Sequence, residues 1–343
     1  MINVLVTGAG GGVGQGIIKS LKMIDDLDIN IIAADMSSLA TGMYASNKSY
    51  LVPACNSLKY INRLEEIFKL ENINYYFPGT DVELEFCAIN KLKIKNNFNV
   101  EVVISNLEAI QISDDKYKTY EFLKKNNFYY PNTFLPSESK DSKIQYPIIM
   151  KPAIGCRSIG VGIVHNQNEL DVRLSNEDGL VIQELIGNAD TEYTCTIVIV
   201  NKKVSDVLIL KRILRSGDTF RAKPIKNNEI SKYVTEVAIA LDIKGSCNFQ
   251  LRTDKNGIPK IFEINCRYSG TTPFCSQLGF NPVEFYLKNS MSLDYEYIID
   301  YDSVVLRNWS EVLVKKEIID KLDKNKYVKP EYNRKIDLFE KIK

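Results

Sequence analysis

The feature that most constrains the fold is an alternation of apolar runs and helical stretches over the first third of the chain. Apolar runs predict strands at Ile2–Thr7, Ile29–Ala34, Tyr75–Phe77 and Val100–Ile104. Stretches with helical patterning lie at Ile17–Met23, Leu64–Glu71 and Val82–Leu92. Strands that alternate with helices are typical of a parallel sheet covered by helices. We therefore predict an α/β domain over residues 1–110.

The pattern changes beyond residue 110. A charged helix is expected from Asp114 to Asn126, and the segment YPIIMKPAIGCRSIGVGIV predicts two antiparallel strands joined by a glycine-rich loop. Further strands are expected at Leu180–Leu185, Glu192–Val200, Val204–Leu210, Ser246–Thr253 and Lys260–Ile264, with a helix at Ile230–Leu241. We predict an α+β region with antiparallel sheets, divided into residues 111–186 and 187–295. Residues 296–343 are charged and are expected to be peripheral.

The composition excludes several classes of function. Lys and Arg number 44 and Asp and Glu 43, so there is no net field that would attract nucleic acid or an anionic membrane. Neither a signal peptide nor an 18-residue apolar run is recognisable. Seven cysteines without a CxxC pair indicate reduced thiols, so we expect a cytoplasmic protein, with a homo-oligomer compatible with the sequence. The only histidine, His165, disfavours serine–histidine hydrolysis and polyhistidine metal sites.

A glycine cluster, Thr7–Gly14, joins the first strand to the first helix and supports a rival interpretation. Such a turn can hold a phosphate, and Asp35 lies where a dinucleotide-binding domain places its ribose-binding acid. An NAD(P)-dependent oxidoreductase would also need a Tyr-x-x-x-Lys pair. Tyr44…Lys48 comes too early for it, and Tyr120…Lys124 comes where the first domain ends. We favour the simpler interpretation that the glycines permit tight strand–helix packing.

The segment Ile261–Arg267 carries a stronger chemical pattern. Alternate residues of a strand share a face, so Glu263, Asn265 and Arg267 are expected to point together, with Phe262 and Ile264 toward the core. Gln250 lies on the preceding strand and is predicted to come close to Glu263 across a hairpin. Oxygen ligands beside a cationic side chain suit Mg²⁺ with a bound phosphate.

Other segments complete a nucleotide site. Lys151 precedes the loop Gly155–Gly162, and a lysine with a flexible glycine loop can close over phosphates. The apolar strand Val181–Ile186 can hold an adenine ring, and Glu192 follows where a carboxylate can accept ribose hydroxyls.

Taken together, these segments resemble the ATP-grasp superfamily, in its carbamoyl-phosphate-synthase-like branch of carboxylate–amine ligases. FEINCRYSG, IIMKPAIGCRSIGVG and NFQLR carry the resemblance, which covers roughly residues 1–290. It implies a Rossmann-like N-terminal domain without a dinucleotide, followed by an ATP-grasp fold. Departures are two extra residues before Glu192, which open the ribose role to Asp190, and Cys266 where proline is common. The short length excludes a full carbamoyl phosphate synthase.

The resemblance also implies roles for individual residues. The expected ATP-binding residues are Lys116, Lys151, Gly155, Arg157, Ser158, Gly160, Gln183, Glu184, Leu185, Ile186 and Glu192. The expected metal ligands are Gln250, Glu263 and Asn265. Arg267, Arg215 and Arg221 are the expected catalytic cations, with Arg212 near the substrate. At strand ends, Asp81 or Glu83 can hold an ammonium group, or serve only as favourable acids at a helix start, while Ser269 and Gly270 can line an acceptor site.

The sequence therefore predicts a ligase that uses ATP and Mg²⁺, with Mn²⁺ as an alternative cation. A small-molecule carboxylate would be activated as an acyl phosphate and passed to a small-molecule amine, releasing ADP and phosphate, with no nucleic acid or membrane as partner. Two alternatives stay open, an NAD(P)-dependent oxidoreductase and a non-catalytic nucleotide-binding protein.

Overall fold

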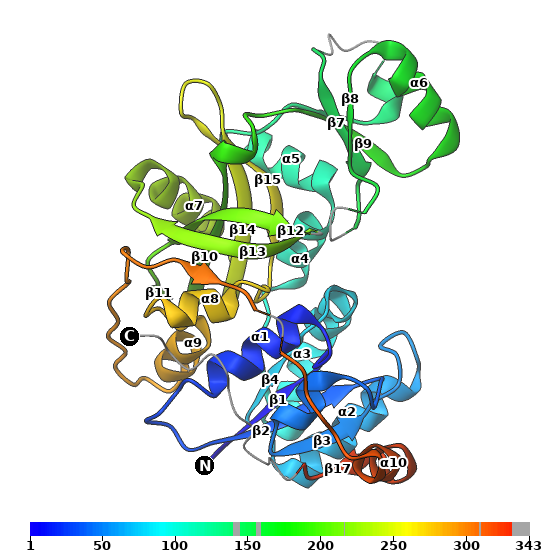
Figure 1. The fold of residues 1–343 in the computed structure, drawn as a ribbon, viewed down its shortest axis with the longest axis vertical. Helices are drawn as coiled ribbons and strands as arrows, with labels where there is room; N and C mark the ends of the chain where they lie inside the picture. Colours follow the sequence, from blue (N-terminus) through cyan, green and yellow to red (C-terminus); the bar gives the residue numbers. More distant parts are fainter. Residues whose placement is uncertain (140–144, 156–158, 216, 309, 331–343) are drawn as a thin grey trace.

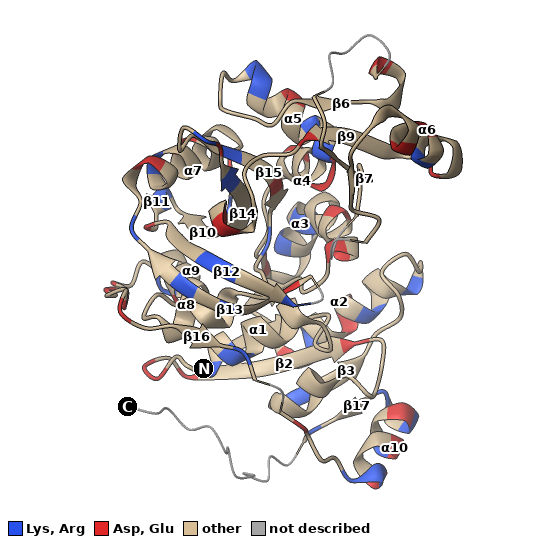
Figure 2. Ribbon diagram, turned by 45° about the horizontal axis from the view of Figure 1, so that its top comes forward, with Lys and Arg blue, Asp and Glu red and all other residues tan. Residues whose placement is uncertain are grey.

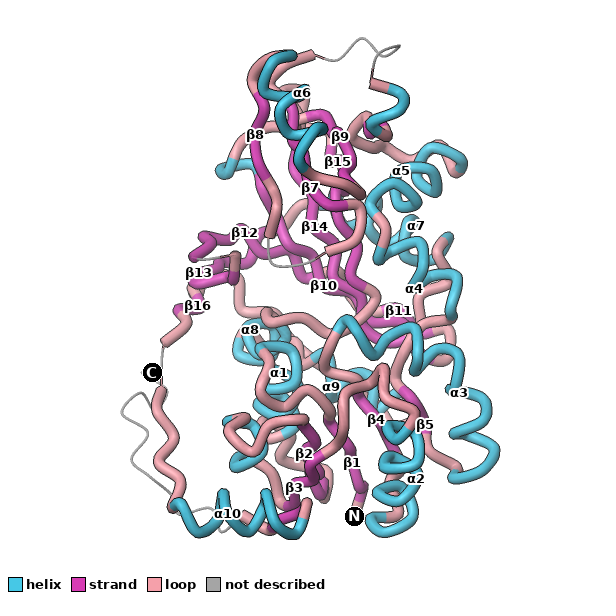
Figure 3. The backbone as a smooth tube through the Cα atoms, turned by 90° about the vertical axis from the view of Figure 1, so that its right-hand side faces the viewer, coloured by secondary structure: helices cyan, strands magenta, loops and turns pink. Residues whose placement is uncertain are grey.

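The computed structural model describes residues 1–139, 145–155, 159–215, 217–308 and 310–330, which build three sheets. A six-stranded sheet lies at one end of the molecule and a four-stranded sheet at the other (Figure 1). The seven-stranded sheet lies between them, as the view in Figure 3 shows. The arrangement confirms the predicted fold class, an α/β domain followed by antiparallel sheets.

The six-stranded sheet forms the N-terminal domain. Its spatial order is β17 (Tyr327–Val328), β3 (Lys48–Leu51), β2 (Ile29–Asp35), β1 (Ile2–Val6), β4 (Tyr75–Phe77) and β5 (Glu101–Val102). The helices of this region are α1 (Gly12–Leu21), α2 (Lys59–Glu71) and α3 (Leu84–Phe98). All neighbouring strands except β17 pair in parallel, as the strand–helix alternation predicts. The sequence reasoning missed β3, a four-residue strand with only two buried residues.

The glycine cluster serves close packing between β1 and α1. A Cβ on Gly14 would lie 2.3 Å from the carbonyl oxygen of Gly8, and one on Gly16 would lie 3.1 Å from Pro273 of the following domain. Gly8 itself has a positive φ of 58°, which favours glycine. These glycines therefore let the chain turn from strand to helix and let α1 approach α8 (Thr272–Gln277).

The seven-stranded sheet is antiparallel and carries most of the candidate site. Its order is β15 (Pro259–Asn265), β14 (Gly245–Thr253), β10 (Glu192–Val200), β12 (Leu208–Arg215), β13 (Asp218–Ile225) and β16 (Val305–Leu306), with β11 (Lys203–Val204) paired to β10. Its neighbouring helices are α4 (Leu107–Asp114), α5 (Lys116–Lys125), α7 (Asn228–Ala240), α8 and α9 (Pro282–Ser290). The predicted single strand at Val204–Leu210 was wrong, because this region forms β11 and the long β12–β13 hairpin.

The four-stranded sheet is the smaller unit at the far end. Its order is β6 (Thr133–Phe134), β9 (Leu180–Glu184), β7 (Ile148–Pro152) and β8 (Gly162–Val164), with α6 (Gln167–Asn176) against it. Its buried cluster contains residues of this unit alone, namely Ile148, Met150, Val164, Leu170, Leu180 and Ile182. The predicted hairpin is confirmed, because β7 pairs with β8 in antiparallel register.

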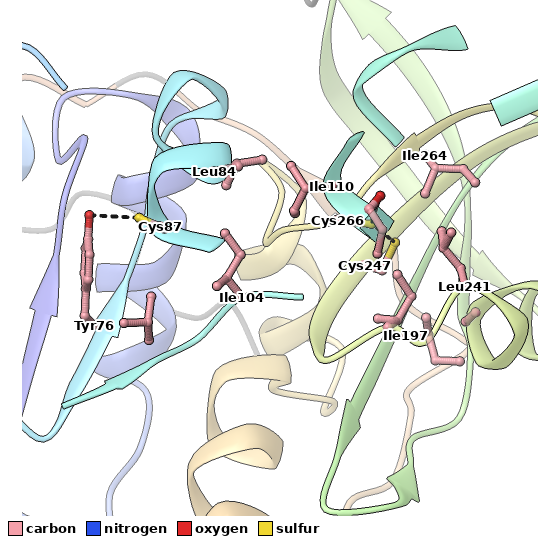
Figure 4. Packing of buried hydrophobic residues seen from close by; sticks show 14 of the residues in the cluster. Tyr76, Leu84, Cys87, Ile104, Ile110, Ile197, Leu241, Cys247, Ile264 and Cys266 are labelled. Atoms are coloured by element: carbon pink, nitrogen blue, oxygen red, sulfur yellow. Dashed lines mark hydrogen bonds between the residues drawn. The ribbon is translucent and has the colours of Figure 1, made fainter. Parts of the chain in front are cut away.

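A larger hydrophobic cluster joins the N-terminal domain to the seven-stranded sheet. Figure 4 shows Leu84 and Ile104 of the first domain on one side and Ile197 and Ile264 of the sheet on the other. Ile110, on α4, lies between the two groups. The two domains therefore share one core, which fixes the end of the first sheet against β15.

The C-terminal segment does more than the peripheral role predicted for residues 296–343. Its strand β16 pairs with β13, and the chain then returns past α10 (Lys316–Asn325) to add β17 to the N-terminal sheet. One short segment thus covers an edge of both large sheets. No helix within the described residues has the length and apolar character needed to cross a membrane.

Alanine substitutions can distinguish a glycine that close packing requires in the β1–α1 turn from one that it does not require. We expect Gly14→Ala to lower the melting temperature and to cost about 1–3 kcal/mol, because its Cβ has no space beside the Gly8 carbonyl. Gly12→Ala is the matched control, since nothing lies within 4 Å of a Cβ at that helical position. Thermal unfolding of both variants tests this, and equal melting temperatures would contradict the packing role.

Candidate active site

A cavity of about 180 Å³ lies between the four-stranded and seven-stranded sheets. Ten of the predicted ATP-binding and metal-ligating residues line it: Lys116, Lys151, Gly155, Gln183, Glu184, Leu185, Ile186, Glu192, Gln250 and Glu263. Arg212 also lines it, with Arg252 and Phe262, which the sequence reasoning did not select. Because the walls come from two separately cored sheets, the cavity has the form of a cleft between two units.

Two lysines enter the cavity from the end nearest the glycine-rich loop. Lys116 begins α5, and its ammonium group donates to the carbonyl of Gly155 at 3.0 Å. Lys151, on β7, is only 4% exposed and donates to the carbonyl of Phe262 at 3.2 Å. Burial lowers the pKa of Lys151 to about 7, although the nearby Glu263 carboxylate partly opposes this shift. An anion entering the cavity would therefore favour the charged form of Lys151.

The predicted adenine-binding hinge follows β9. The side chain of Gln183 donates to Thr133 at 2.9 Å, and the Glu184 carboxylate accepts from Lys260 at 3.2 Å and from the backbone of Asn132. These contacts bind the hinge to β6 and β15, so the end of β9 is held in place. Leu185 and Ile186 continue along the cavity wall and give it an apolar surface.

Glu192 begins β10 and is held between two arginines. Its carboxylate accepts from Arg212 at 2.9 Å on one oxygen and from Arg252 at 2.8 Å on the other. Asp190, the alternative for the ribose role, has a 90% exposed side chain and lies 3.8 Å from Lys211 outside the cavity. The geometry therefore favours Glu192 over Asp190 as the carboxylate of this wall.

The predicted metal ligands come together as the alternation of strand residues indicates. Gln250 pairs with Glu263 across β14 and β15, and the Gln250 amide donates to the carboxylate at 3.2 Å. The Asn265 amide donates to the same oxygen at 2.9 Å. One carboxylate and two amides supply only hard oxygen donors, which suits Mg²⁺ or Mn²⁺. Within the described part of the chain, no group of three or more His, Cys, Asp or Glu competes as a metal site.

Phe262 corrects the sequence prediction, which placed its side chain in the core. The pairing of β14 with β15 shifts register at this point, since Gln250 pairs with Glu263 but Leu251 pairs with Ile261. This β-bulge leaves Phe262 without a partner on β14 and lets it line the cavity beside Glu263. The Lys151 ammonium group lies 5.3 Å from the centre of its ring. Strict alternation cannot reveal a bulge, so no local pattern could have placed Phe262 in the cavity.

Arg267 connects the predicted metal ligands to the N-terminal domain. It donates to the Asn265 amide oxygen at 3.0 Å and forms an ion pair with Asp81. Asp81 follows β4, at the carboxyl end of the parallel sheet, where ligands of such sheets bind. The backbone of Ser269 and Gly270 lies two to three residues further along, and the carbonyl of Gly270 accepts from Arg307. The predicted substrate side is therefore contiguous with the metal ligands.

Glu83 does not fit the substrate-binding role proposed for it. Its side chain is buried and accepts hydrogen bonds from Thr7 at 2.6 Å, Tyr60 at 2.7 Å and Tyr76 at 2.8 Å. A fourth donor is the hydroxyl of Thr80. With both oxygens occupied, Glu83 ties β1, α2 and β4 together and leaves Asp81 as the acid that faces the site.

Arg215 and Arg221 do not reach the cavity. Both lie on the exposed face of the β12–β13 hairpin, where each contacts the ring of Phe220. Figure 2 shows the Lys and Arg of these two strands. Because Arg221 pairs with Ile213 rather than with Arg212, it points away from the cavity. Of the loop residues, Gly160 accepts from Arg173 at 2.6 Å, whereas Arg157 and Ser158 lie outside the described residues.

The features behind the dinucleotide alternative have other uses in the structure. The Asp35 carboxylate accepts from the backbone of Gly10 at 2.8 Å, which closes the glycine turn on itself. Tyr44 donates to the carbonyl of Ser38, and Lys124 donates to Tyr120 on α5, beyond the N-terminal sheet. Neither tyrosine–lysine pair is thus arranged around the turn, which supports the packing interpretation.

Comparison with known families agrees with this geometry. Residues 113–271 match the family model of the ATP-grasp domain, and residues 4–103 match that of the PylC-like N-terminal domain. The chain contains an ATP-grasp domain. Among curated relatives, the carbamoyl phosphate synthase large chains of Methanosarcina barkeri and Clostridium botulinum (strain Loch Maree) are each 24% identical, over 306 and 314 residues. These matches cover 80% and 82% of this chain but 28% of each relative, so this ATP-grasp chain spans little more than a quarter of their length.

Solved structures share the same fold. L-amino acid ligase from Bacillus licheniformis superposes with a TM-score of 0.66 at 17% identity, covering 85% of this chain and 74% of the other. N5-carboxyaminoimidazole synthetase from Staphylococcus aureus, complexed with ADP, gives 0.69 at 14% identity, with coverages of 87% and 80%. Biotin carboxylase from Campylobacter jejuni gives 0.68 at 16% identity, with coverages of 86% and 72%. At such identities the likeness concerns the ATP-grasp fold alone.

The buried Lys151 predicts that nucleotide binding depends on pH. Its pKa of about 7 leaves it mostly neutral at pH 8, and phosphate oxygens nearby would raise that pKa. Binding should then take up close to one proton, and the affinity for ADP should fall as the pH rises from 7 to 9, by up to about tenfold per unit. Calorimetry in two buffers of different ionisation enthalpy measures the uptake. Lys151→Met should abolish it, and an unchanged uptake in that variant would exclude Lys151 as its source.

Proposed function

We propose that this ATP-grasp protein is a ligase that joins a small carboxylate to a small amine at the expense of ATP. One observation carries the proposal, a continuous chain of side-chain contacts from the nucleotide-sized cavity to the N-terminal sheet. In order, it runs through Glu192, Arg212, Gln250, Glu263, Asn265, Arg267 and Asp81. This row of contacts links the carboxylate proposed for the ribose to the acid proposed for the substrate, through the residues that suit a metal.

The nucleotide would lie with its base along the hinge and its phosphates toward the two lysines. Leu185 and Ile186 offer the base an apolar wall, and Phe262 offers a ring face. Lys116 and Lys151 would contact the phosphates through their ammonium groups. The complexes of the Staphylococcus aureus synthetase with ADP and of the Campylobacter jejuni carboxylase with an ATP species support nucleotide binding by this fold. A divalent cation held by Glu263, Asn265 and Gln250 would neutralise phosphate charge.

The first chemical step needs alignment and charge compensation more than a protein base. A carboxylate oxygen of the substrate attacks the γ-phosphorus, the bond to the bridging oxygen of ADP breaks, and an acyl phosphate forms. Lys151 and Arg267 would flank the phosphoryl group that is transferred, and each side chain is anchored by a hydrogen bond. His165, the only histidine of the chain, is exposed just before α6 and does not line the cavity, so these cations are the groups proposed to compensate the charge.

The second step transfers the acyl group to the amine. The nitrogen attacks the acyl carbon, the bond to the phosphate oxygen breaks, and the proton that the amine loses passes to phosphate or solvent. Asp81, beside Arg267, is the carboxylate best situated to orient an ammonium group of either substrate. Ser269 and Gly270 would line the acceptor side. The L-amino acid ligase of Bacillus licheniformis supports substrates of this size.

Ligand-dependent stability distinguishes this proposal from the oxidoreductase alternative. Mg²⁺ with ATP at 100 times its Kd should stabilise the protein by about 2.7 kcal/mol, since it binds only the folded state. NAD⁺ and NADP⁺ should leave the melting temperature unchanged, because Asp35 already accepts from the glycine turn. Thermal shift with each ligand measures this, and stabilisation by a nicotinamide cofactor alone would refute the ligase.

Substitution of Glu263 tests catalysis directly. Glu263→Gln keeps the shape but removes the carboxylate between Gln250 and Asn265, so turnover should fall by about two orders of magnitude or more while folding changes little. Asn265→Ala should lose activity too, and the combined loss should be less than additive because both act at one metal site. Substrate-dependent ADP release, screened over amino acids and amines, gives the rate.

A charge-matched control accompanies the Glu263 variants. Glu236→Gln removes a carboxylate from the exposed side of α7 and should keep wild-type turnover, since its side chain is 52% exposed. Melting curves establish that each variant is folded. Near-wild-type ADP release by a folded Glu263→Gln protein would remove the metal assignment.

A further inference from the structure

Arg252 has no assigned part in phosphoryl transfer, yet it contacts two walls of the nucleotide cavity. It lies on β14, directly opposite Glu192 of β10 in the antiparallel register. Its guanidinium donates to Glu192 Oε2, with Nε at 2.9 Å, and to the carbonyl of Ile186 at 3.3 Å. One side chain thus connects the end of the hinge, expected beside the base, with the carboxylate expected beside the ribose.

The two arginines on either side of Glu192 have different second partners. Arg212 binds Glu192 Oε1 and turns its other contact, at 2.7 Å, to the amide oxygen of Gln250 among the metal ligands. Arg252 binds Oε2 and reaches the hinge instead. Arg212 therefore connects the carboxylate to the phosphate end of the cavity, and Arg252 connects it to the base end.

This division affects how Glu192 can meet a sugar. A carboxylate has about four acceptor positions, and Arg212 already donates to Oε1 of Glu192 through two nitrogens. A sugar hydroxyl would therefore be accepted on Oε2, where it would share or replace a bond from Arg252. The side chain of Glu192 is only 10% exposed, and a buried carboxylate without a partner would be costly. The two arginines together fix the orientation of the carboxylate, because Arg212 holds Oε1 and Arg252 holds Oε2. Arg252 also sets the separation between that carboxylate and the hinge carbonyl.

We propose that Arg252 is a positioning residue that makes this cavity selective for ribonucleotides, by holding Glu192 at a fixed place relative to the base. The inference rests on the proposed function to the extent that the cavity binds ATP. Without Arg252, Arg212 still compensates the charge of Glu192, but the carboxylate is free to turn toward Gln250. The nucleotide then keeps its phosphate and base contacts and loses the aligned contact with the sugar hydroxyls.

Calorimetric affinities for ATP, 2′-deoxy-ATP and 3′-deoxy-ATP, each with Mg²⁺, test the proposal. The wild-type protein should prefer ATP over at least one deoxy analogue by on the order of tenfold or more, the value of a hydrogen bond to a charged group. Arg252→Met should reduce that preference to within about twofold, mainly because its affinity for ATP should fall. Arg252→Lys keeps a charge near Glu192 and should restore part of the preference, which a purely structural role would not do.

Lys260→Met provides the matched control. Lys260 also pairs a cation with a carboxylate of the same cavity, but its partner is Glu184 on the hinge and not Glu192. The Lys260→Met variant should keep the wild-type preference for ATP over its deoxy analogues, even if the affinities for all three nucleotides change together. Melting curves confirm folding, and Arg252→Gln replaces Arg252→Met if the latter does not fold.

The outcomes separate the inference from the function on which it rests. A wild-type protein that binds none of the three nucleotides would overturn both. Two results would overturn the role of Arg252 and leave the ligase proposal standing. One is equal affinity of the wild-type protein for all three nucleotides, and the other is an equal loss of affinity for all three in Arg252→Met. Loss of the preference in Arg252→Met together with its retention in Lys260→Met supports the inference.

Discussion

The antiparallel pairing of β10, β14 and β15 is the constraint on which the rest of the site depends. It places Glu192 beside Arg252 and Gln250 beside Glu263, so that side chains far apart in the sequence form one row across three strands. A shift of one residue in either pairing would turn every second side chain to the opposite face. The hydrophobic face of the same strands, buried against α7 and the N-terminal domain, holds that register. Packing of the hydrophobic core thereby fixes which polar side chains face the site together.

The row also alternates in charge, which explains how so many polar groups are buried together. Arginines flank the carboxylate of Glu192, and Arg212 and Arg267 each donate to an amide oxygen, while both amides donate to Glu263. Within the described part of the chain, every buried side-chain nitrogen or oxygen has a hydrogen-bond partner. Because arginine only donates and carboxylate only accepts, these partners dictate which way each amide faces. Ligands that enter must therefore exchange existing bonds rather than satisfy unpaired groups.

Period-two alternation and strand–helix alternation were sufficient to predict the fold class and the grouping of Gln250, Glu263 and Asn265. The same alternation puts Arg252, two residues after Gln250, on the same face, but the sequence analysis did not select it, because its partner Glu192 lies on a strand whose pairing the sequence does not specify. The position of Phe262 follows from a bulge, which depends on the pairing partner and not on local sequence. Arg221 was misplaced because the register of an unrecognised hairpin decides its face. Glu83 was misread because its four hydroxyl partners come from separate segments.

The N-terminal domain contributes to the site through two kinds of contact that act together. Gly14 and Gly16 allow α1 to lie close to the β1 turn and to α8, while Glu83 ties β1 and β4 to α2. These contacts leave little freedom for Asp81, which follows β4 and forms the ion pair with Arg267. Side-chain contacts thus run from Asp81 to Arg267, and through Asn265 to Glu263. This single row of contacts joins the carboxyl end of the N-terminal sheet to the strand that carries Glu263.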